Sequence, residues 1–191
     1  MQLIHRTHTT LARDTHPSRR QRRAMMLAMS ALFSLAAAGC GGDGPLAPGI
    51  GTGSLTATGA VSASGSGLAL FQSISSGGTS LFQVVIAPLS QGTTTWQVQI
   101  ANYSGRLETG TYSLTPLSAG SSTPTANFYY TTGGTMQMFN STSGELVITS
   151  SSSSAVRGSF TFSATDPAGG TSAVTVQGSF NAQCAPGMGC L

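Results

Sequence analysis

The stretch VRGSFTFSATDPAGGTSAVTVQGSFNA, residues 156–182, decides the fold class of this chain. Apolar side chains alternate with polar ones on both sides of a central DPAGG segment, at Val156, Phe160 and Phe162 and again at Val174, Val176 and Phe180. A period of two is typical of a half-buried β-strand, and Asp, Pro and Gly together are typical of a turn. The stretch therefore predicts a β-hairpin of two amphipathic strands.

The same alternation recurs along the chain from residue 54 onward. In TTWQVQIA, Trp96, Val98 and Ile100 share one parity, and LFQVVIAPL reads as a more buried strand that stops at Pro88. TTGG between NFYY and TMQMF predicts a further turn. No segment after residue 40 repeats apolar residues at helical spacing, so we expect an all-β domain over residues 54–191. Roughly eight to ten strands fit a single antiparallel β-sandwich or flattened β-barrel.

Charge is scarce and concentrated at the N-terminus. Charged residues make up 7% of the chain, Lys is absent, and six of the eight Arg precede residue 24. After Cys40, two Arg face four acidic residues, a net charge of −2. Nucleic-acid binding requires clustered basic residues, so we expect no nucleic-acid partner.

The N-terminal segment reads as an export signal. Residues 1–23 are polar and basic, residues 24–39 are mostly apolar, and Cys40 follows. A basic region, an apolar run of about 7–15 residues and small residues at its end are typical of a secretory signal peptide, and the run is short for a span of about 20 residues. We predict residues 1–39 as a signal peptide.

The sequence LAAAGC, residues 35–40, resembles a bacterial lipobox, in which the cysteine receives a diacylglycerol and becomes the new N-terminus. Ala37 stands where that family usually has Leu. Lipidation at Cys40 is our first interpretation, with ordinary secretory cleavage or an uncleaved anchor as alternatives. Residues 40–53 would then be the lipidated cysteine and a Gly- and Pro-rich tether, since such chain is flexible.

The C-terminal pattern GELVIT, GSFTFSA and VTVQGSF, together with the lipobox, resembles a group of small bacterial lipoproteins of uncharacterised function. The resemblance implies an exported all-β domain, lipid-anchored in the cell envelope at the outer membrane or cell surface. It supplies no catalytic residues.

Cys184 and Cys190 form the second cysteine feature, because lipidation of Cys40 leaves these two of the three cysteines as a pair. An oxidising envelope favours a disulfide between them. Free thiols or a soft-metal pair are the alternatives.

Catalytic groups are few. No His follows residue 16 and no Lys is present, which excludes Ser-His-Asp, His-zinc and Ser-Lys chemistry after Cys40. We expect no catalytic residues, no cofactor and no metal site. A hydrolase that uses only Glu108, Glu145 and Asp166 is the weakest hypothesis. We expect the two Glu at strand edges beside turn glycines Gly110 and Gly144, and Asp166 as a turn initiator.

Two aromatic residues are candidate ligand contacts. Trp96 lies in an alternating strand, and Tyr129 has the opposite parity to Phe128 and Tyr130. The first functional hypothesis is a non-catalytic envelope lipoprotein with a structural or binding role. The alternative is a carbohydrate- or polymer-binding module that uses aromatic and amide side chains on a β-face.

Overall fold

The computed structural model describes residues 50–76, 78–90, 92–116, 122–185, 187 and 189–190. The secondary structure of this part of the chain consists of strands, which are, in chain order, β1 (Gly51–Gly59), β2 (Ala63–Ser76), β3 (Thr79–Ala87), β4 (Thr94–Asn102), β5 (Gly110–Ser113), β6 (Thr125–Thr132), β7 (Thr135–Ser151), β8 (Ala155–Thr165) and β9 (Ala173–Cys184). The predicted all-β class and strand number are confirmed.

The strands form one sheet in the order β5-β7-β6-β4-β3-β2-β1-β9-β8, and an additional β7–β8 pairing closes it. Eight strands therefore make a barrel, and β5 lies outside this ring against β7. Strands that follow one another in the ring are joined directly, except that residues 103–124 carry β5 between β4 and β6. The antiparallel β1–β9 seam joins the two ends of the domain.

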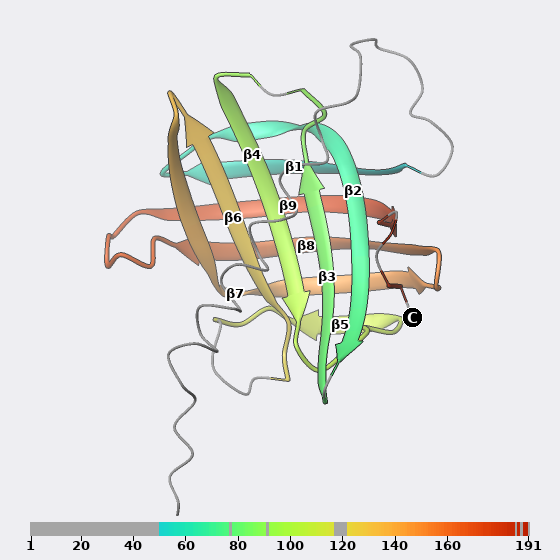
Figure 1. The fold of residues 1–191 in the computed structure, drawn as a ribbon. Coiled ribbons are helices and arrows are strands. Elements are labelled where there is room, and N and C mark those ends of the chain that lie inside the picture. Colours follow the sequence, from blue (N-terminus) through green and yellow to red (C-terminus); the bar gives the residue numbers. More distant parts are fainter. Residues whose placement is uncertain are drawn as a thin grey trace, which may run out of the picture. The chain divides into compact units, whose positions relative to one another are not determined.

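The barrel is flattened. Figure 1 shows β3, β4 and β6 crossing β1, β9 and β8 at a steep angle, which gives a front layer and a back layer. The two long strands belong to both layers: β2 pairs with β1 through residues 63–69 and with β3 through residues 68–76. β7 pairs first with β6 and then, from Asn140 onward, with β8. These strands turn the two corners of the barrel.

A β-bulge allows β7 to turn its corner. Its register against β8 shifts between Ser141 and Ser143, which leaves Thr142 as an extra residue. An extra residue reverses the parity of the buried side chains, so Phe139 is buried before the bulge and Leu146 after it.

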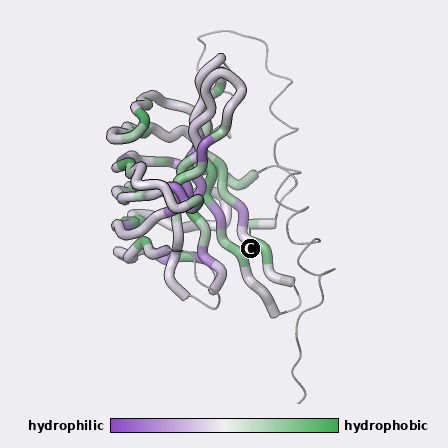
Figure 2. The backbone as a smooth tube through the Cα atoms, turned by 90° about the vertical axis from the view of Figure 1, so that its left-hand side faces the viewer, coloured by the Kyte–Doolittle hydropathy of each residue, from purple (hydrophilic) through white to green (hydrophobic). Residues whose placement is uncertain are grey.

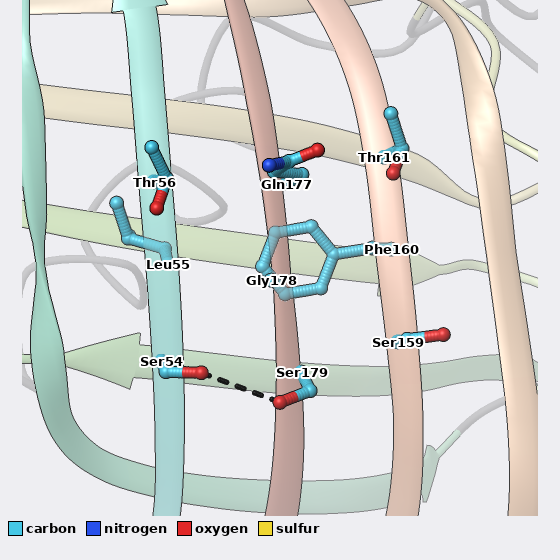
Figure 3. A pocket seen from close by; sticks show the side chains of 9 residues that line it. All are labelled: Ser54, Leu55, Thr56, Ser159, Phe160, Thr161, Gln177, Gly178 and Ser179. Atoms are coloured by element: carbon cyan, nitrogen blue, oxygen red, sulfur yellow. Dashed lines mark hydrogen bonds between the residues drawn. The ribbon is translucent and has the colours of Figure 1, made fainter.

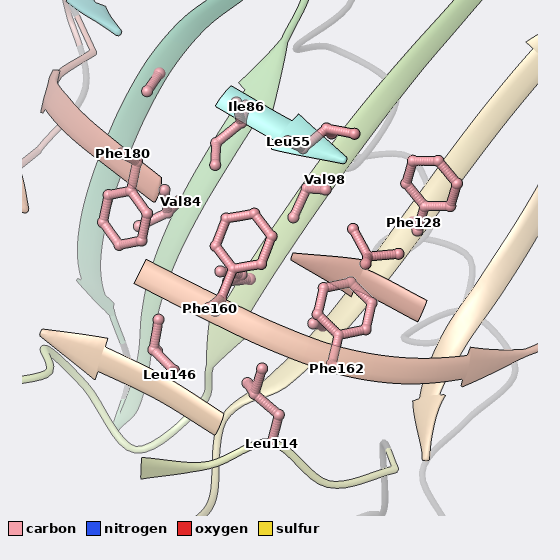
Figure 4. Close-up of a cluster of buried hydrophobic side chains, with 14 of the residues drawn as sticks. Leu55, Val84, Ile86, Val98, Leu114, Phe128, Leu146, Phe160, Phe162 and Phe180 are labelled. Carbon is pink, nitrogen blue, oxygen red and sulfur yellow. The ribbon is translucent and has the colours of Figure 1, made fainter. Parts of the chain in front are cut away.

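Apolar side chains of both layers fill the inside of the barrel (Figure 4). Figure 2 shows a mostly pale backbone, because Ser, Thr and Gly, which have intermediate hydropathy, dominate the strands. Short hydrophobic and hydrophilic stretches interrupt it. The largest fully buried side chains are Phe71, Phe82, Phe128, Phe162, Ile86, Ile100, Leu114, Leu146, Ile148, Val84, Val98 and Val156.

Two Gly-Ser-Phe tripeptides interlock across β8 and β9. Gly158 lies opposite Phe180, and Phe160 lies opposite Gly178. A Cβ at Gly178 would lie 2.6 Å from a ring carbon of Phe160, and one at Gly158 would lie 2.9 Å from a ring carbon of Phe180. Each glycine therefore provides the space that the facing phenylalanine fills, and the two rings stack with centroids 6.4 Å apart.

The predicted hairpin over residues 156–182 is confirmed, with β8 and β9 in continuous antiparallel register. The Asp166 carboxylate accepts a hydrogen bond from the Ala168 backbone N–H at 2.8 Å, as expected of a turn initiator. β3 ends at Ala87, directly before Pro88.

β1 begins at Gly51, three residues before the domain start that the sequence predicts. The predicted tether, residues 40–53, therefore includes the first residues of the barrel. Gly51 is a packing position: a Cβ there would lie 2.2 Å from the Ala69 carbonyl oxygen and 2.4 Å from that of Asn181. A glycine needed for close packing looks the same in sequence as one in a flexible tether.

The predicted signal peptide (residues 1–39), Cys40 and the tether up to residue 49 lie outside the described residues. In the part of the chain that the structure describes, no helix has the length and hydrophobicity to cross a membrane.

Candidate functional site

The structure places Trp96 and Tyr129, the two candidate ligand contacts, on opposite faces of the front layer. Trp96 is 8% exposed and packs in the core, with Gly65 directly against its indole. Tyr129 has the other parity and lies on the outer face, between Gln97 on β4 and Met138 on β7. The two side chains do not form a common site, and Tyr129 is the one placed on a surface.

Tyr129 lies in a polar but uncharged environment. Its hydroxyl donates a hydrogen bond to the Gln99 side-chain oxygen at 3.2 Å. Burial, with a smaller contribution from the nearby Tyr103 phenol, raises the pKa of the Tyr129 hydroxyl above its usual value of about 10. The phenol therefore stays neutral through the physiological pH range and acts as a hydrogen-bonding group.

Amide side chains extend from Tyr129 across the outer face of the front layer toward β3 and β2. Gln72 donates to Gln83 across β2 and β3 at 2.7 Å, and both are largely buried. We call this surface the amide face; it consists of Gln72, Gln83, Gln97, Gln99, Asn127 and Tyr129. Gln72 is hydrogen-bonded to Gln83 and Tyr129 to Gln99, and all the groups are uncharged, which suits hydrogen bonding and not proton transfer. The amides of Gln72, Gln83, Gln99 and Asn127 are largely buried.

The outer face of the back layer has a different character. A shallow depression of about 360 Å³ crosses β1, β9 and β8 there (Figure 3). Its walls are two rows of side chains that the strand registers place side by side, and its floor is the chain at Leu55, Phe160 and Gly178. We call it the hydroxyl trough; its walls are Ser54, Ser179 and Ser159 in one row and Thr56, Gln177 and Thr161 in the other.

The hydroxyl trough contains no ionisable side chain. Ser54 and Ser179 lie within hydrogen-bond distance, with their hydroxyl oxygens 3.3 Å apart. The walls offer both donors and acceptors, as a hydroxyl-rich ligand requires. The lining itself can bind a neutral polar chain and offers no acid, base or charged nucleophile; the exposed Glu145 lies beside it, opposite Thr161.

The three carboxylates proposed for a hydrolase lie on different elements. Glu145 pairs with Ser113 on one side and Thr161 on the other. Asp166 follows Thr161 by five residues, so their Cα atoms are roughly 16 Å apart along the strand. Glu108 lies before β5, where its carbonyl accepts a hydrogen bond from the Tyr112 hydroxyl. Two carboxylates that share a glycosidic bond lie about 5–10 Å apart, which Glu145 and Asp166 do not match.

The expectation that Glu145 lies at a strand edge is wrong, because β5 and β8 flank it on both sides. Gly144 is not a turn glycine; it lies inside β7, where a Cβ would be 2.5 Å from the Cβ of Phe162. Among the described residues, no three His, Cys, Asp or Glu side chains gather closely enough to hold a metal ion.

Arg106, which the sequence analysis did not single out, joins three segments at one end of the barrel. Its guanidinium lies 5.3 Å from the centre of the Phe71 ring, in a cation–π arrangement. It also donates to the Ser151 hydroxyl at 3.0 Å, to the Ser152 carbonyl and to the Cys190 carbonyl at 3.4 Å. Its isolation as one of only two Arg after Cys40 was the available signal.

The predicted disulfide between Cys184 and Cys190 is confirmed. The loop that it closes returns to β2: the Ser73 N–H donates to the Gly189 carbonyl at 2.8 Å, and the Ala185 N–H donates to the Phe71 carbonyl at 2.9 Å. The C-terminal loop thus provides hydrogen-bond partners for backbone groups of β2 at Phe71 and Ser73, where β1 no longer pairs with β2. This gives the disulfide a structural role, since unpaired strand edges invite association.

Comparison of the chain with protein-family models, with curated proteins and with solved structures found no match.

Proposed function

We propose that this chain is a lipid-anchored, non-catalytic domain of the bacterial cell envelope that interacts through its charge-poor outer surface. The distribution of side chains carries this proposal: apolar residues fill the barrel, while Ser, Thr and Gln cover its outside. The charged side chains Arg106, Arg157 and Asp166 have structural partners. Glu108 and Glu145 are exposed. We therefore expect a ligand or partner to meet the polar outer face of the barrel.

The proposed anchor is a diacylglycerol on Cys40, supported by the resemblance of LAAAGC to a lipobox. One acyl chain gives only marginal membrane binding, whereas two or more give stable anchoring. Cys40→Ser should abolish lipid modification and move the chain out of the membrane fraction of a bacterial host. Asp43→Asn, three residues further along, is the matched control and should behave as wild type. Identical fractionation and mass processing of the Cys40→Ser and wild-type chains would refute the anchor.

A second candidate function is binding of a neutral carbohydrate polymer. The hydroxyl trough favours it, because two parallel rows of hydroxyl and amide groups match a chain of sugar hydroxyls in chemistry. Tyr129 on the amide face, in the other layer, offers a separate contact for such a ligand, since aromatic rings with a polar tip suit surfaces that are partly wet.

Affinity electrophoresis through neutral envelope and plant polysaccharides tests this candidate. Thr161→Ala with Gln177→Ala removes part of the walls of the hydroxyl trough and should release a polymer bound there. Thr175→Ala, on the same exposed face but outside the trough, is the control. Tyr129→Ala tests the amide face separately: reduced retardation of this variant would show that the polymer binds there and not in the hydroxyl trough. Unretarded migration of the wild-type chain in every polymer would reject carbohydrate binding and leave the anchored domain intact as a proposal.

A further inference from the structure

The first half of β7 has one strand edge that is not covered. Residues 135–140 pair with β6 on one side, and pairing with β8 on the other side begins only at Asn140. In the part of the chain that the structure describes, no strand lies against this second edge at residues 135–139. Figure 1 shows this half of β7 at the left-hand border of the front layer.

The hairpin geometry determines which backbone groups point to the uncovered edge. Thr132 and Thr135 flank the two-residue turn Gly133–Gly134, whose φ angles are +57° and +80°. In such a hairpin the flanking pair exchanges hydrogen bonds, and hydrogen-bonded and non-hydrogen-bonded pairs then alternate. Residues 135, 137 and 139 therefore direct their backbone groups to β6. Met136 and Met138 direct theirs outward.

Side chains at this edge do not block pairing. Met136 is 62% exposed and Met138 is 37% exposed, and both are among the exposed large hydrophobic residues of the described chain. Residues 135–139 contain no charge and no Pro, which are the usual devices that protect an edge. The corresponding corner at β2 is covered, because the loop closed by the disulfide forms hydrogen bonds with the backbone of β2.

We propose that the uncovered edge, Thr135–Phe139, pairs antiparallel with the same edge of a second copy of this chain, about a two-fold axis at Gln137. In this register Met136 of each copy lies opposite Met138 of the other. These are the two residues whose N–H and C=O groups point outward, so the pairing forms two closely spaced pairs of hydrogen bonds. All four methionines gather on one face, beside Tyr129.

The segment TMQMF favours a second copy over a foreign strand because it is complementary to itself. The pairing meets no like charges, since both edges are neutral. It places methionine against methionine, where flexible thioether side chains adapt to one another. Five residues give a small contact, below the roughly 1,200 Å² of a stable interface. The association should therefore be reversible and should increase with concentration or with confinement on a surface.

Cysteine cross-linking tests the register. Gln137→Cys in the full-length chain places the new thiol opposite its counterpart, in a non-hydrogen-bonded pair whose Cα separation of about 4.5 Å permits a disulfide. Thr135→Cys is the matched control, because two residues 135 would lie roughly 13 Å apart in this register. A reducible dimer from Gln137→Cys, well above the levels of wild type and Thr135→Cys, is expected. Equal cross-linking of the two variants would overturn the register.

Lysine substitutions test whether the uncovered edge forms the contact between the two copies. Met136→Lys with Met138→Lys should lower the dimer fraction in sedimentation velocity roughly tenfold, because like charges then lie next to each other in the pair. Thr175→Lys adds a lysine to an exposed position of β9 that is paired on both sides, and should leave association unchanged. Wild-type chain that stays monomeric up to high concentration, or that pairs only with another protein at this edge, would overturn the proposal.

Discussion

The smallest features that shape this barrel are single glycines placed against aromatic rings. Gly158 lies opposite Phe180, and Gly178 lies opposite Phe160. Because glycine has no side chain, each phenylalanine ring can occupy the space that two facing side chains would otherwise share. A ring that covers a cross-strand glycine also protects a backbone that lacks a side chain. These contacts help to set the β8–β9 register, because a slip by one residue would face each ring away from its glycine.

Gly178→Ala should therefore lower the free energy of unfolding by about 2 kcal/mol, as overpacking of a filled core does. The new Cβ would lie 2.2 Å from the Ser54 carbonyl oxygen and 2.6 Å from the Phe160 ring. Urea denaturation measures the effect. Ser179→Ala, next in sequence and exposed, serves as control and should change the value by less than about 0.5 kcal/mol. Equal stability of Gly178→Ala and wild type would show that the strands move apart without cost.

Tyr129 predicts how stability depends on alkaline pH. Its phenol titrates near 10 in the unfolded chain and higher in the folded barrel. Above pH of about 10 the unfolded state therefore loses a proton that the folded state retains, and stability falls as the pH rises toward the folded pKa. Tyr129→Phe should reduce this fall, measured by denaturation at pH 8 and in steps above pH 10. An unchanged alkaline profile in Tyr129→Phe would contradict the assignment.

Elements meet at the end of the barrel where Arg106 lies. The β4–β5 connection supplies the guanidinium, the end of β7 supplies Ser151, the β7–β8 turn supplies Ser152, and the C-terminal loop supplies the Cys190 carbonyl. These partners lie 45, 46 and 84 residues away in sequence. One planar group with several fixed donors suits such a junction better than a lysine would.

Arg106→Met should destabilise the barrel by about 2 kcal/mol, because it keeps the aliphatic stem but leaves two carbonyls and a hydroxyl without their donor. Thermal unfolding of the oxidised protein measures the effect. Arg157→Met is the matched control: Arg157 is exposed and donates only to the Asn181 side chain among the described contacts, at 3.1 Å. Its loss should cost less than about 0.5 kcal/mol. Similar losses in both variants would remove the special role of Arg106.

At the scale of the whole molecule, closure depends on the two ends of the domain. β1 contacts β9 along eight residue pairs, from Thr52 with Asn181 to Gly59 with Val174. Without this seam, the sheet would present two long hydrogen-bonding edges, at β1 and β9. A closed barrel avoids such edges, whereas an open sheet of this size invites aggregation.

Truncation after Ser172 removes β9 and should abolish the folded barrel, giving aggregated or unfolded chain in size-exclusion chromatography and circular dichroism. Truncation after Ala185 is the control. It removes the disulfide-closed loop over β2 but keeps the β1–β9 seam, so the barrel should fold with reduced stability. A folded monomer from the shorter chain would show that the remaining strands form a stable open sheet.

Local patterns in the sequence were sufficient for the strands of the hairpin at residues 156–182 and for the turn at Gly133–Gly134. They were not sufficient to assign faces. In TMQMF, Met136 and Met138 share one parity, but it is Phe139, of the other parity, that is buried. The Thr142 bulge then reverses the parity within the same strand. The core position of Trp96 and the strands on both sides of Glu145 were not readable for a related reason, because neither the face nor the neighbouring strands can be read locally.

The sequence by itself determined the all-β class and the scarcity of charge, since side-chain alternation and composition are local properties. It favoured a disulfide between Cys184 and Cys190, which the structure confirms. Only the tertiary structure decided the closure through β1 and β9, the reciprocal Phe–Gly packing, the Arg106 junction and the uncovered edge of β7. Each of these depends on which distant strands lie side by side and in which register. A period of two residues records that a strand has two faces, but not which face meets the core or which strand lies at its edge.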